Sequence, residues 1–328
     1  MHKNNQGISV VICCHNSCTK IEATLNAMAL QMQQPDIGFE IIVVDNCCTD
    51  NTVNKTLQHW DKLGNLFPLT VVQEPTPGLS YARQKGINAA AFEYIILCDD
   101  DNWLCNDYLL KAFTIFEAQP EAALLGGVGE AVFEGNICPV WFKKLDGFGY
   151  AVGDEGRTTG FTSTVYGAGM GIRKTVFNKL IGANWAIILS DRKGNSLSSG
   201  GDTEICLIIK NAGHKIYFDQ SLKFKHFISA NRLQWNYYLK LRRSFGFANA
   251  YLAVYKNEKL GHLSGKDFYR NLLQFYYFIF RNLHFFLFPF LFKTGRCAWF
   301  IQNLSLRRTL LFERNQILFL TKKMMQLN

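Results

Sequence analysis

Three consecutive aspartates, Asp99, Asp100 and Asp101, directly follow the apolar run at residues 94–98. A strand buried on both faces reads as a continuous apolar run, and open α/β sheets bind ligands at the carboxyl ends of such strands. Neighbouring carboxylates repel one another, and their hard oxygens suit a divalent cation that itself carries phosphate. The run therefore predicts a metal and phosphate site. A solvated acidic turn that caps the next helix is the structural alternative.

Polar residues also follow three other apolar runs, at 9–14, 40–45 and 69–73. The side chains concerned are Asn16, Asp45 and Arg83. Segments with helical periodicity separate the runs, and a further run lies at 123–128, so the pattern predicts an α/β fold with a mainly parallel sheet flanked by helices. The carboxyl ends of parallel strands lie along one edge of a sheet. The four polar groups are therefore expected to form a single site.

Two motifs lie further along the chain. Asp202, in GGDTE, opens a helix predicted at 203–211, where a negative side chain is favourable; as a simple helix cap it would need no other role. The glycine-rich GAGMG at 167–171 lacks the preceding strand of a dinucleotide motif, and we interpret it as a turn that lets a ligand approach the backbone closely. The sequence contains no P-loop motif.

Composition and charge indicate the class of protein and its surroundings. Of 328 residues, 19% are charged and 48% are apolar, which is typical of a globular protein. Residues 221–328 hold 18 Lys and Arg against 3 Asp and Glu, a net charge of +15, whereas the rest holds 17 against 23, a net charge of −6. Ten scattered cysteines without zinc-ligand spacing and no visible signal peptide favour a reducing cytosol.

The basic C-terminal third contains a long apolar and aromatic stretch at 271–292. Its length would span a bilayer, but Arg281, His284 and Pro289 lie within it, and a central Arg costs about 2.5–3.5 kcal/mol on insertion scales. We expect a helix that lies in the headgroup plane of an anionic leaflet. A buried or dimerising helical surface is the alternative. The predicted division is a domain at 1–231 and a helical, membrane-associating extension at 232–328.

Seven stretches together resemble the inverting family 2 glycosyltransferases, which have the GT-A fold. They cover roughly residues 8–246 and occur in the family's order: SVVICCHN, IIVVDNCCTDNT, PGLSYARQKGI, ILCDDDNWL, GAGMGIRK, GGDTEICLIIKNAGHKI and KFKHFISANRL. The resemblance implies that Asp45 contacts the nucleotide base and that Asp99 and Asp101 form the family's DxD pair around ribose, metal and diphosphate.

The resemblance also implies roles for residues outside these strand ends. His226 would complete a site for Mg²⁺ or Mn²⁺ with Asp99 and Asp101, and Asp202 would act as the general base. Asn16, Arg83 and Asp100 are included in the nucleotide-sugar site, although the side chain of Asp100 is expected to point elsewhere. Apart from the resemblance, Trp141 and Trp185 lie on irregular segments, where they could stack on the sugar faces of an acceptor or belong to the core. Glu204 is the third candidate acceptor contact.

The leading hypothesis is therefore metal-assisted transfer of a sugar from a nucleotide-diphosphate sugar, UDP-sugars first, to a hydroxyl of a glycan or lipid-linked acceptor. The expected setting is cell-surface polysaccharide synthesis, with the enzyme peripheral on the cytoplasmic face of the cell membrane. The alternative is a non-enzymatic protein that binds nucleic acid or membranes through its basic third. The basic residues, however, are interleaved with a Phe-rich stretch, which disfavours a nucleic-acid partner. A sugar-nucleotide pyrophosphorylase would need a Gly- and Arg-rich loop where CCHNSCT stands.

Overall fold

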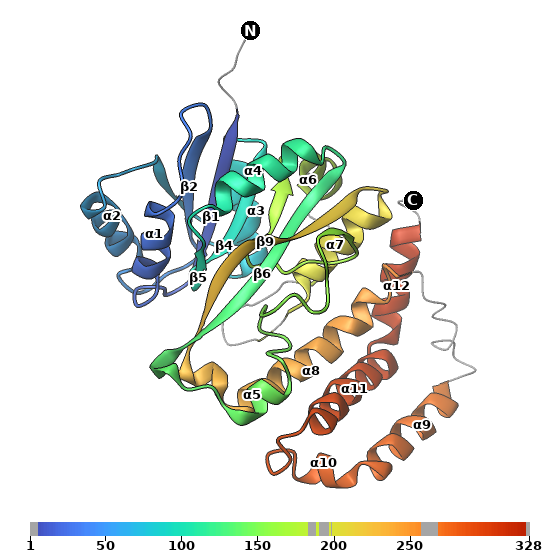
Figure 1. Ribbon diagram of the computed structural model, residues 1–328. Helices are drawn as coiled ribbons and strands as arrows, with labels where there is room; N and C mark the ends of the chain where they lie inside the picture. Colours follow the sequence, from blue (N-terminus) through green and yellow to red (C-terminus); the bar gives the residue numbers. More distant parts are fainter. Residues whose placement is uncertain (1–5, 183–187, 190–196, 198, 257–267, 326–328) are drawn as a thin grey trace.

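The computed structural model describes residues 6–182, 188–189, 197, 199–256 and 268–325, with no side chains described beyond residue 320. Within them, nine strands form one sheet in the order β3-β2-β1-β4-β8-β6-β9-β5, and β7 pairs with β9 (Figure 1). The strands are β1 Gly7–Cys14, β2 Gly38–Asp45, β3 Leu69–Gln73, β4 Tyr94–Asp99, β5 Asn102–Leu104, β6 Ala122–Phe133, β7 Gly160–Thr162, β8 Gly171–Arg173 and β9 Lys215–Ile228.

The N-terminal half of the sheet is parallel, as the sequence predicts. Strands β3, β2, β1 and β4 run in one direction, and β8 is the antiparallel strand between β4 and β6. In the register of these strands Cys14 lies opposite Asp45, and Cys13 lies opposite Asp99. The polar groups that follow β1, β2 and β4 are thereby brought to one edge.

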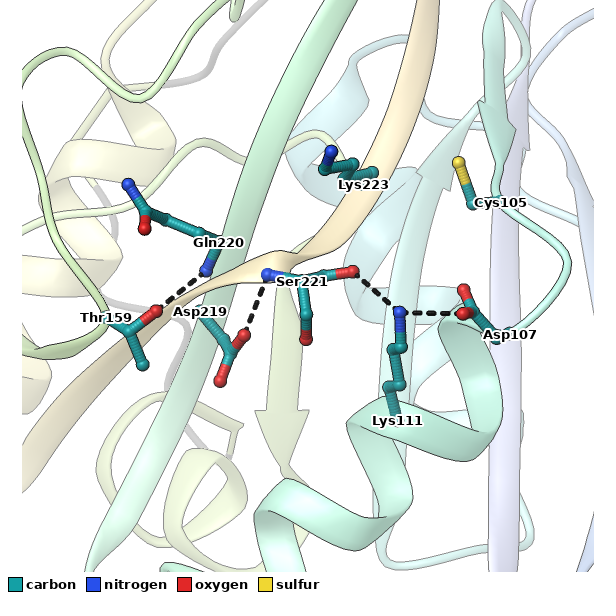
Figure 2. A pocket seen from close by; sticks show the side chains of 8 residues that line it. All are labelled: Cys105, Asp107, Lys111, Thr159, Asp219, Gln220, Ser221 and Lys223. Carbon is teal, nitrogen blue, oxygen red and sulfur yellow. Dashed lines mark hydrogen bonds and ion pairs between the residues drawn. The ribbon is translucent and has the colours of Figure 1, made fainter.

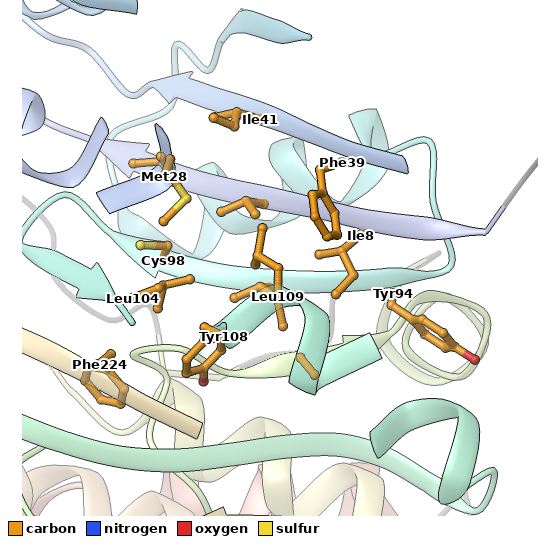
Figure 3. Close-up of a cluster of buried hydrophobic side chains, with 14 of the residues drawn as sticks. Ile8, Met28, Phe39, Ile41, Tyr94, Cys98, Leu104, Tyr108, Leu109 and Phe224 are labelled. Atoms are coloured by element: carbon orange, nitrogen blue, oxygen red, sulfur yellow. The ribbon is translucent and has the colours of Figure 1, made fainter. Parts of the chain in front are cut away.

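Helices cover both faces of the sheet, because the strand side chains alternate between two apolar cores. Ile8, Val10 and Ile12 of β1 enter one core, and Val11 enters the other. Figure 3 shows the first core, where Ile8 and Met28 gather with Leu109. The helices on this side are α1 Ile21–Ala29, α2 Thr52–Lys62 and α4 Tyr108–Ala118; the other side is covered by α3 Leu79–Ala89, α6 Lys174–Phe177 and α7 Gly201–Asn211.

Strands β6 and β9 are longer than the apolar runs suggest. From the sequence, a strand is predicted only at Lys215–Phe218. In the structure, β9 continues to Ile228: its register with β6 shifts where Gly126 pairs with Phe218 and Val128 with Lys223, so the residues between Phe218 and Lys223 form a bulge. This continuation places His226 within the sheet.

The C-terminal third is helical, but the expected interfacial helix at 271–292 is broken. Helix α9 (Phe268–Arg281) ends before Asn282, α10 (Leu283–Leu287) follows, and Pro289 lies beyond it. The other helices are α8 Trp235–Leu252, α11 Gly295–Phe312 and α12 Arg314–Met325, with α5 Val140–Lys144 and short turns at Glu134–Asn136, Asn178–Gly182 and Ala230–Leu233 elsewhere. Within the described residues, no helix combines the length and apolarity needed to cross a membrane.

Helices α8 and α11 pack on the rest of the chain through a third core. Trp235 and Tyr238 of α8 meet Trp141 of α5, and Phe300 of α11 joins the same cluster. The two segments of the predicted division thus share an apolar cluster. Figure 1 shows α8 and α11 side by side, and a Cβ atom on Gly246 of α8 would lie only 2.0 Å from the backbone oxygen of Gln302 of α11.

We expect Gly246→Ala to reduce the free energy of unfolding by about 1–3 kcal/mol, since the added carbon forces the two helices apart. The gain in helix propensity, about 1 kcal/mol, offsets only part of this cost. Urea unfolding measures the change, with Lys240→Ala on the exposed side of α8 as the control, expected within about 0.5 kcal/mol of wild type. Equal stability of both variants would contradict the close helix contact.

Candidate active site

Asn16 ties the loop after β1 to the loop after β2, and Asp45, the residue predicted to meet the nucleotide base, braces the second of these loops. The side-chain oxygen of Asn16 accepts a hydrogen bond from the backbone N–H of Thr49 at 2.7 Å, and Asn16 itself adopts a φ of +55°. Asp45 Oδ1 accepts from the backbone N–H of Cys48 at 2.9 Å. Both side chains remain partly or fully accessible, so they shape the loops and still face solvent.

Asn46, which follows Asp45, organises the next loop and is buried. Its amide donates to the backbone carbonyls of Glu74 at 3.0 Å and Thr76 at 2.7 Å, and its oxygen accepts from the N–H of Gly78 at 2.8 Å. These bonds fix the segment that leads into α3. Asn46 therefore determines where Arg83, one turn into that helix, is presented.

Arg83 and Asp202 meet at a single glycine, and Arg83 also faces Asp99. The Arg83 guanidinium lies 3.6 Å from Asp99 Oδ1, and its side chain is nearly buried. A Cβ atom on Gly167 would lie 2.8 Å from Arg83 Nη2 and 3.1 Å from the Cβ of Asp202. The backbone N–H of Gly167 donates to Asp202 Oδ2 at 3.0 Å. The glycine-rich turn thus permits a close approach, made here by Arg83 and Asp202.

Asp101 and His226 meet through strand pairing, because β5 and β9 are antiparallel with Asn102 opposite His226. Asp101 Oδ1 lies 3.6 Å from His226 Nε2. A residue that the motifs did not single out, Arg232, donates from Nη1 to Asp101 Oδ2 at 2.9 Å. Burial disfavours the charge on Arg232, but the Asp101 carboxylate outweighs it, and the pKa of Arg232 is raised.

The imidazole of His226 is held as the neutral tautomer with its proton on Nδ1. Nδ1 lies 2.6 Å from the backbone carbonyl oxygen of Tyr150, which can only accept. Burial lowers the pKa of His226, and the Asp101 carboxylate opposes this only in part. Nε2 therefore carries a lone pair toward Asp101, and a carbonyl on the other nitrogen is the usual arrangement for a metal-binding histidine.

These residues fit a divalent cation whose coordination is completed by substrate. No three His, Cys, Asp or Glu side chains in the described ranges converge as a preformed cage. Mg²⁺, however, is usually bound through one or two carboxylates together with substrate phosphates. Asp101 and His226 supply two converging donors, and Asp99 lies two residues before Asp101 with its carboxylate partly exposed. The donor set suits Mg²⁺ or Mn²⁺.

Asp100 has different surroundings from its two neighbours. Its carboxylate accepts from the Ser17 hydroxyl and pairs with the Lys20 ammonium at 3.1 Å. Its backbone carbonyl accepts from the Thr24 hydroxyl at 2.8 Å. Burial, and then the charge of Asp101, raise the pKa of Asp100. Asp100 thus joins the aspartate run to α1, while its assignment to the nucleotide-sugar site stays a prediction.

Two of the three expected acceptor contacts lie in the interior. Trp141 packs against Trp235 and Tyr238 in the third core. Glu204 is fully buried, and its carboxylate accepts from the backbone N–H groups of residues 188 and 189, at 2.7 and 2.8 Å, and from the Tyr255 hydroxyl. Both positions correct the expectation of contact with an acceptor. Trp185 lies outside the described residues.

Comparison with known proteins identifies the family. The family model for glycosyl transferase family 2 matches residues 9–180, more than half of the chain. The chain belongs to this family. The match covers β1 to β4, the aspartate run and the glycine-rich turn, whereas Asp202, His226 and Arg232 lie beyond it.

Named relatives of this family 2 glycosyltransferase are sugar transferases. A glucosyl-dolichyl phosphate glucuronosyltransferase of Haloferax volcanii is 20% identical over 244 residues, 70% of this chain and 72% of the relative. The poly(ribitol-phosphate) β-N-acetylglucosaminyltransferase TarS of Staphylococcus aureus is 31% identical over 119 residues, 36% of this chain but only 20% of TarS. The protein is therefore a sugar-transferring enzyme.

Solved structures confirm the GT-A fold. The mannosyltransferase PcManGT from Pyrobaculum calidifontis, in complex with GDP-Man and Mn²⁺, aligns with a TM-score of 0.53 and 16% identity over 74% of this chain and 63% of that one. GalNAc-T7 with UDP, GalNAc and Mn²⁺ aligns with a TM-score of 0.53 and 15% identity over 81% of this chain and 54% of that one. The match covers less than two thirds of the length of each of these two proteins.

A surface recess of about 640 Å³ lies apart from the candidate site of the glycosyltransferase, at the bulge of β9 (Figure 2). Its charged groups include Lys111, which pairs with Asp107 at 2.6 Å and donates to the Ser221 carbonyl at 3.3 Å. Asp219 accepts from the Ser221 N–H at 2.8 Å. None of the predicted site residues lines the recess, so we do not assign the sugar-transfer reaction to it.

Arg232 is the main site residue that the sequence motifs leave out. The stretch KFKHFISANRL contains both His226 and Arg232, six residues apart, but periodicity indicates nothing about their separation in space. In the structure the turn Ala230–Leu233 after β9 returns Arg232 to within 3.3 Å of His226 Nε2. The sequence signal that could have identified Arg232 is a single Arg a few residues after the histidine.

Proposed function

We propose that this glycosyltransferase transfers a sugar, with inversion, from a nucleotide-diphosphate sugar to a hydroxyl of a glycan or lipid-linked acceptor in cell-surface polysaccharide synthesis. The observation that carries the proposal is the meeting of Asp202 with Arg83 at Gly167, because it sets a carboxylate beside a cation that can bind an anion and that also faces Asp99. UDP-sugars are the first candidates for the donor. Relatives named for glucosyl-dolichyl phosphate and poly(ribitol-phosphate) support a lipid-linked or polymeric acceptor.

Each part of the donor has residues suited to it. Asn16 and Asp45, at the ends of β1 and β2, are partly open to a nucleoside, and a carboxylate can accept hydrogen bonds from a base. Arg83 can pair with a phosphate oxygen in place of Asp99. Asp101 and His226, with Asp99, would hold Mg²⁺ or Mn²⁺. When bound, the ion neutralises charge that develops on the departing nucleoside diphosphate.

Asp202 is suited to the role of general base. Its carboxylate is oriented by two backbone donors, the N–H of Gly167 at 3.0 Å and the N–H of Thr203 at 2.8 Å, and it remains partly exposed. Asp202 would take the proton from the acceptor hydroxyl as that oxygen attacks the anomeric carbon from the face opposite the leaving diphosphate. One displacement of this kind inverts the anomeric configuration.

A donor panel tests the proposal. Purified full-length protein is incubated with UDP-, GDP- and dTDP-sugars, Mn²⁺ and a lipid-linked glycan acceptor, and the release of nucleoside diphosphate is measured. We expect one donor class to be consumed in an acceptor-dependent manner, and NMR of the product to show the anomer opposite to that of the donor. A product with retained configuration would contradict the single displacement.

We also propose that the enzyme works peripherally on the cytoplasmic face of the cell membrane, docked through α9 and α10. One face of α9 is a stripe of exposed apolar residues at helical spacing. Its members are 58–75% exposed: Tyr269, Leu273, Tyr276, Tyr277 and Phe280. The opposite face is anchored, since Phe275 and Phe278 pack against Phe312 and Phe300 of α11.

Charge around this stripe favours an anionic lipid surface over a protein partner. Residues 268–325 contain nine Lys and Arg but one acidic residue, Glu313, and Tyr251 donates a hydrogen bond to that carboxylate. An apolar stripe on a segment with a net positive charge fits the interface of a bilayer rich in anionic lipids. Docking there would bring the enzyme to a lipid-linked acceptor.

We expect the triple variant Leu273→Ser, Tyr277→Ser and Phe280→Ser to bind anionic vesicles at least about tenfold less tightly, because each buried apolar side chain contributes about 1.5–3 kcal/mol. Flotation with phosphatidylglycerol vesicles measures the bound fraction. The matched control replaces Leu30, Leu57 and Leu66, exposed leucines near α1 and α2, with Ser. Undiminished flotation would contradict membrane docking, and loss of a vesicle-independent dimer would identify the stripe as a self-association surface.

A further inference from the structure

Arg232 occupies the position between the two residues expected to hold the cation. Its Nη1 lies 2.9 Å from Asp101 Oδ2 and 3.3 Å from His226 Nε2. One nitrogen thus contacts both side chains. Because the His226 proton is on Nδ1, facing the Tyr150 carbonyl at 2.6 Å, Nε2 can only accept from Arg232. The guanidinium therefore binds lone pairs of Asp101 Oδ2 and His226 Nε2, the atoms to which a metal ion would also bind.

A divalent cation and this arrangement of Arg232 exclude each other. Two positive groups on the same carboxylate and imidazole would repel strongly in a site where the side chains of Asp101 and His226 are only 10% and 6% exposed. Entry of the cation therefore requires Arg232 to leave both contacts.

The guanidinium also has unused donor capacity where it stands. Its Nε is buried and has no hydrogen-bond partner in the part of the chain that the structure describes. A buried donor without a partner is costly, so another arrangement of the side chain can satisfy it better. Guanidinium groups bind phosphate oxygens through two parallel donors, and a nucleoside diphosphate arriving with the cation would supply such oxygens.

We propose that Arg232 is a donor-binding residue that exchanges partners: it neutralises Asp101 while the site lacks a cation, and it moves to the diphosphate of the donor when the cation binds Asp101 and His226. This inference rests on the proposed donor site. The exchange couples the two ligands, because the cation displaces the guanidinium and the diphosphate receives it. Cation binding is weak until the nucleotide is present.

Mn²⁺ binding to the full-length protein, followed by the EPR signal of free Mn²⁺, tests the exchange with and without UDP. Removing the guanidinium that competes for Asp101 should let Arg232→Gln bind Mn²⁺ about tenfold more tightly than wild type without nucleotide, a difference of about 1.4 kcal/mol. UDP affinity at saturating Mn²⁺ should fall about tenfold, since a charge-assisted phosphate contact is lost. Arg232→Lys, which keeps the charge, should stay near wild type for Mn²⁺ alone and provides a second variant.

Arg242→Gln is the matched control. Arg242 also has a buried Nε without a partner in the described residues, but its guanidinium contacts Tyr238 and Phe148, away from the cation site. Its Mn²⁺ and UDP affinities should equal those of wild type. Equal Mn²⁺ affinity of wild type and Arg232→Gln, with binding that Asp101→Asn abolishes, would overturn the exchange alone. Mn²⁺ and UDP binding that survives Asp101→Asn would overturn the proposed donor site as well.

Discussion

Asp202→Asn should lower the turnover number by about a thousandfold, within the range of 10² to 10⁴ that a general base contributes. The amide cannot accept the proton of an attacking hydroxyl. It also places an NH₂ group against one of the two backbone donors that orient the carboxylate, Gly167 N–H or Thr203 N–H. The rate of nucleoside diphosphate release at saturating donor and acceptor measures the effect.

Binding measurements separate this chemical defect from a general loss of the site. The donor is anionic, so removing a negative charge beside Arg83 should leave UDP affinity unchanged or higher. Asp219→Asn is the matched control: that aspartate accepts from the Ser221 N–H at the β9 bulge, and its variant should retain full turnover. Turnover of Asp202→Asn within twofold of wild type would remove Asp202 from the role of base.

Asp101→Ala should both abolish transfer and destabilise the fold. Removing one partner of a buried ion pair costs about 3–5 kcal/mol, because the other charge is left without compensation. Here that charge is Arg232, whose side chain is 13% exposed. Urea unfolding gives the stability change. Transfer is measured at a temperature 20 °C below the thermal unfolding midpoint of the variant, so that unfolding does not account for the lost activity.

Two further variants separate the structural and functional contributions of Asp101. Asp99→Ala should lose transfer at nearly unchanged stability, since the Asp99 carboxylate is 31% exposed and pairs with Arg83 at 3.6 Å; such pairs are worth about 1 kcal/mol or less. The double variant Asp101→Ala with Arg232→Met should recover stability, because the uncompensated charge is gone, but not transfer. Equal stability of the two single variants would contradict the buried pair.

Much of the fold and part of the site follow from local sequence patterns. Apolar runs are long enough to identify β1, β2, β3 and β4, and the order of strands and helices implies a mainly parallel sheet, which the structure confirms for these four strands. Asp45 and Asp99 could be placed at one edge because they end parallel strands, β2 and β4, that flank β1 on either side. This reasoning needs only periodicity and the geometry of parallel sheets.

Burial of individual side chains could not be predicted in the same way. Trp141 and Glu204 look accessible in a glycine-rich and polar stretch, yet the first packs under α8 and the second binds the backbone at 188–189. The helix break at Asn282 was missed for a related reason. A run of aromatic residues suits both a continuous helix and a broken one, and packing against α11 determines which forms.

The sequence by itself determined the reaction class, the fold class and the edge of the sheet at which the polar residues of the strand ends gather. Only the tertiary structure decided which charges neutralise one another. Asp101 and Arg232 are 131 positions apart, and they meet because β5 pairs antiparallel with β9 and a short turn then reverses the chain. Such pairing depends on the register between distant strands, and no local pattern of residues encodes that register.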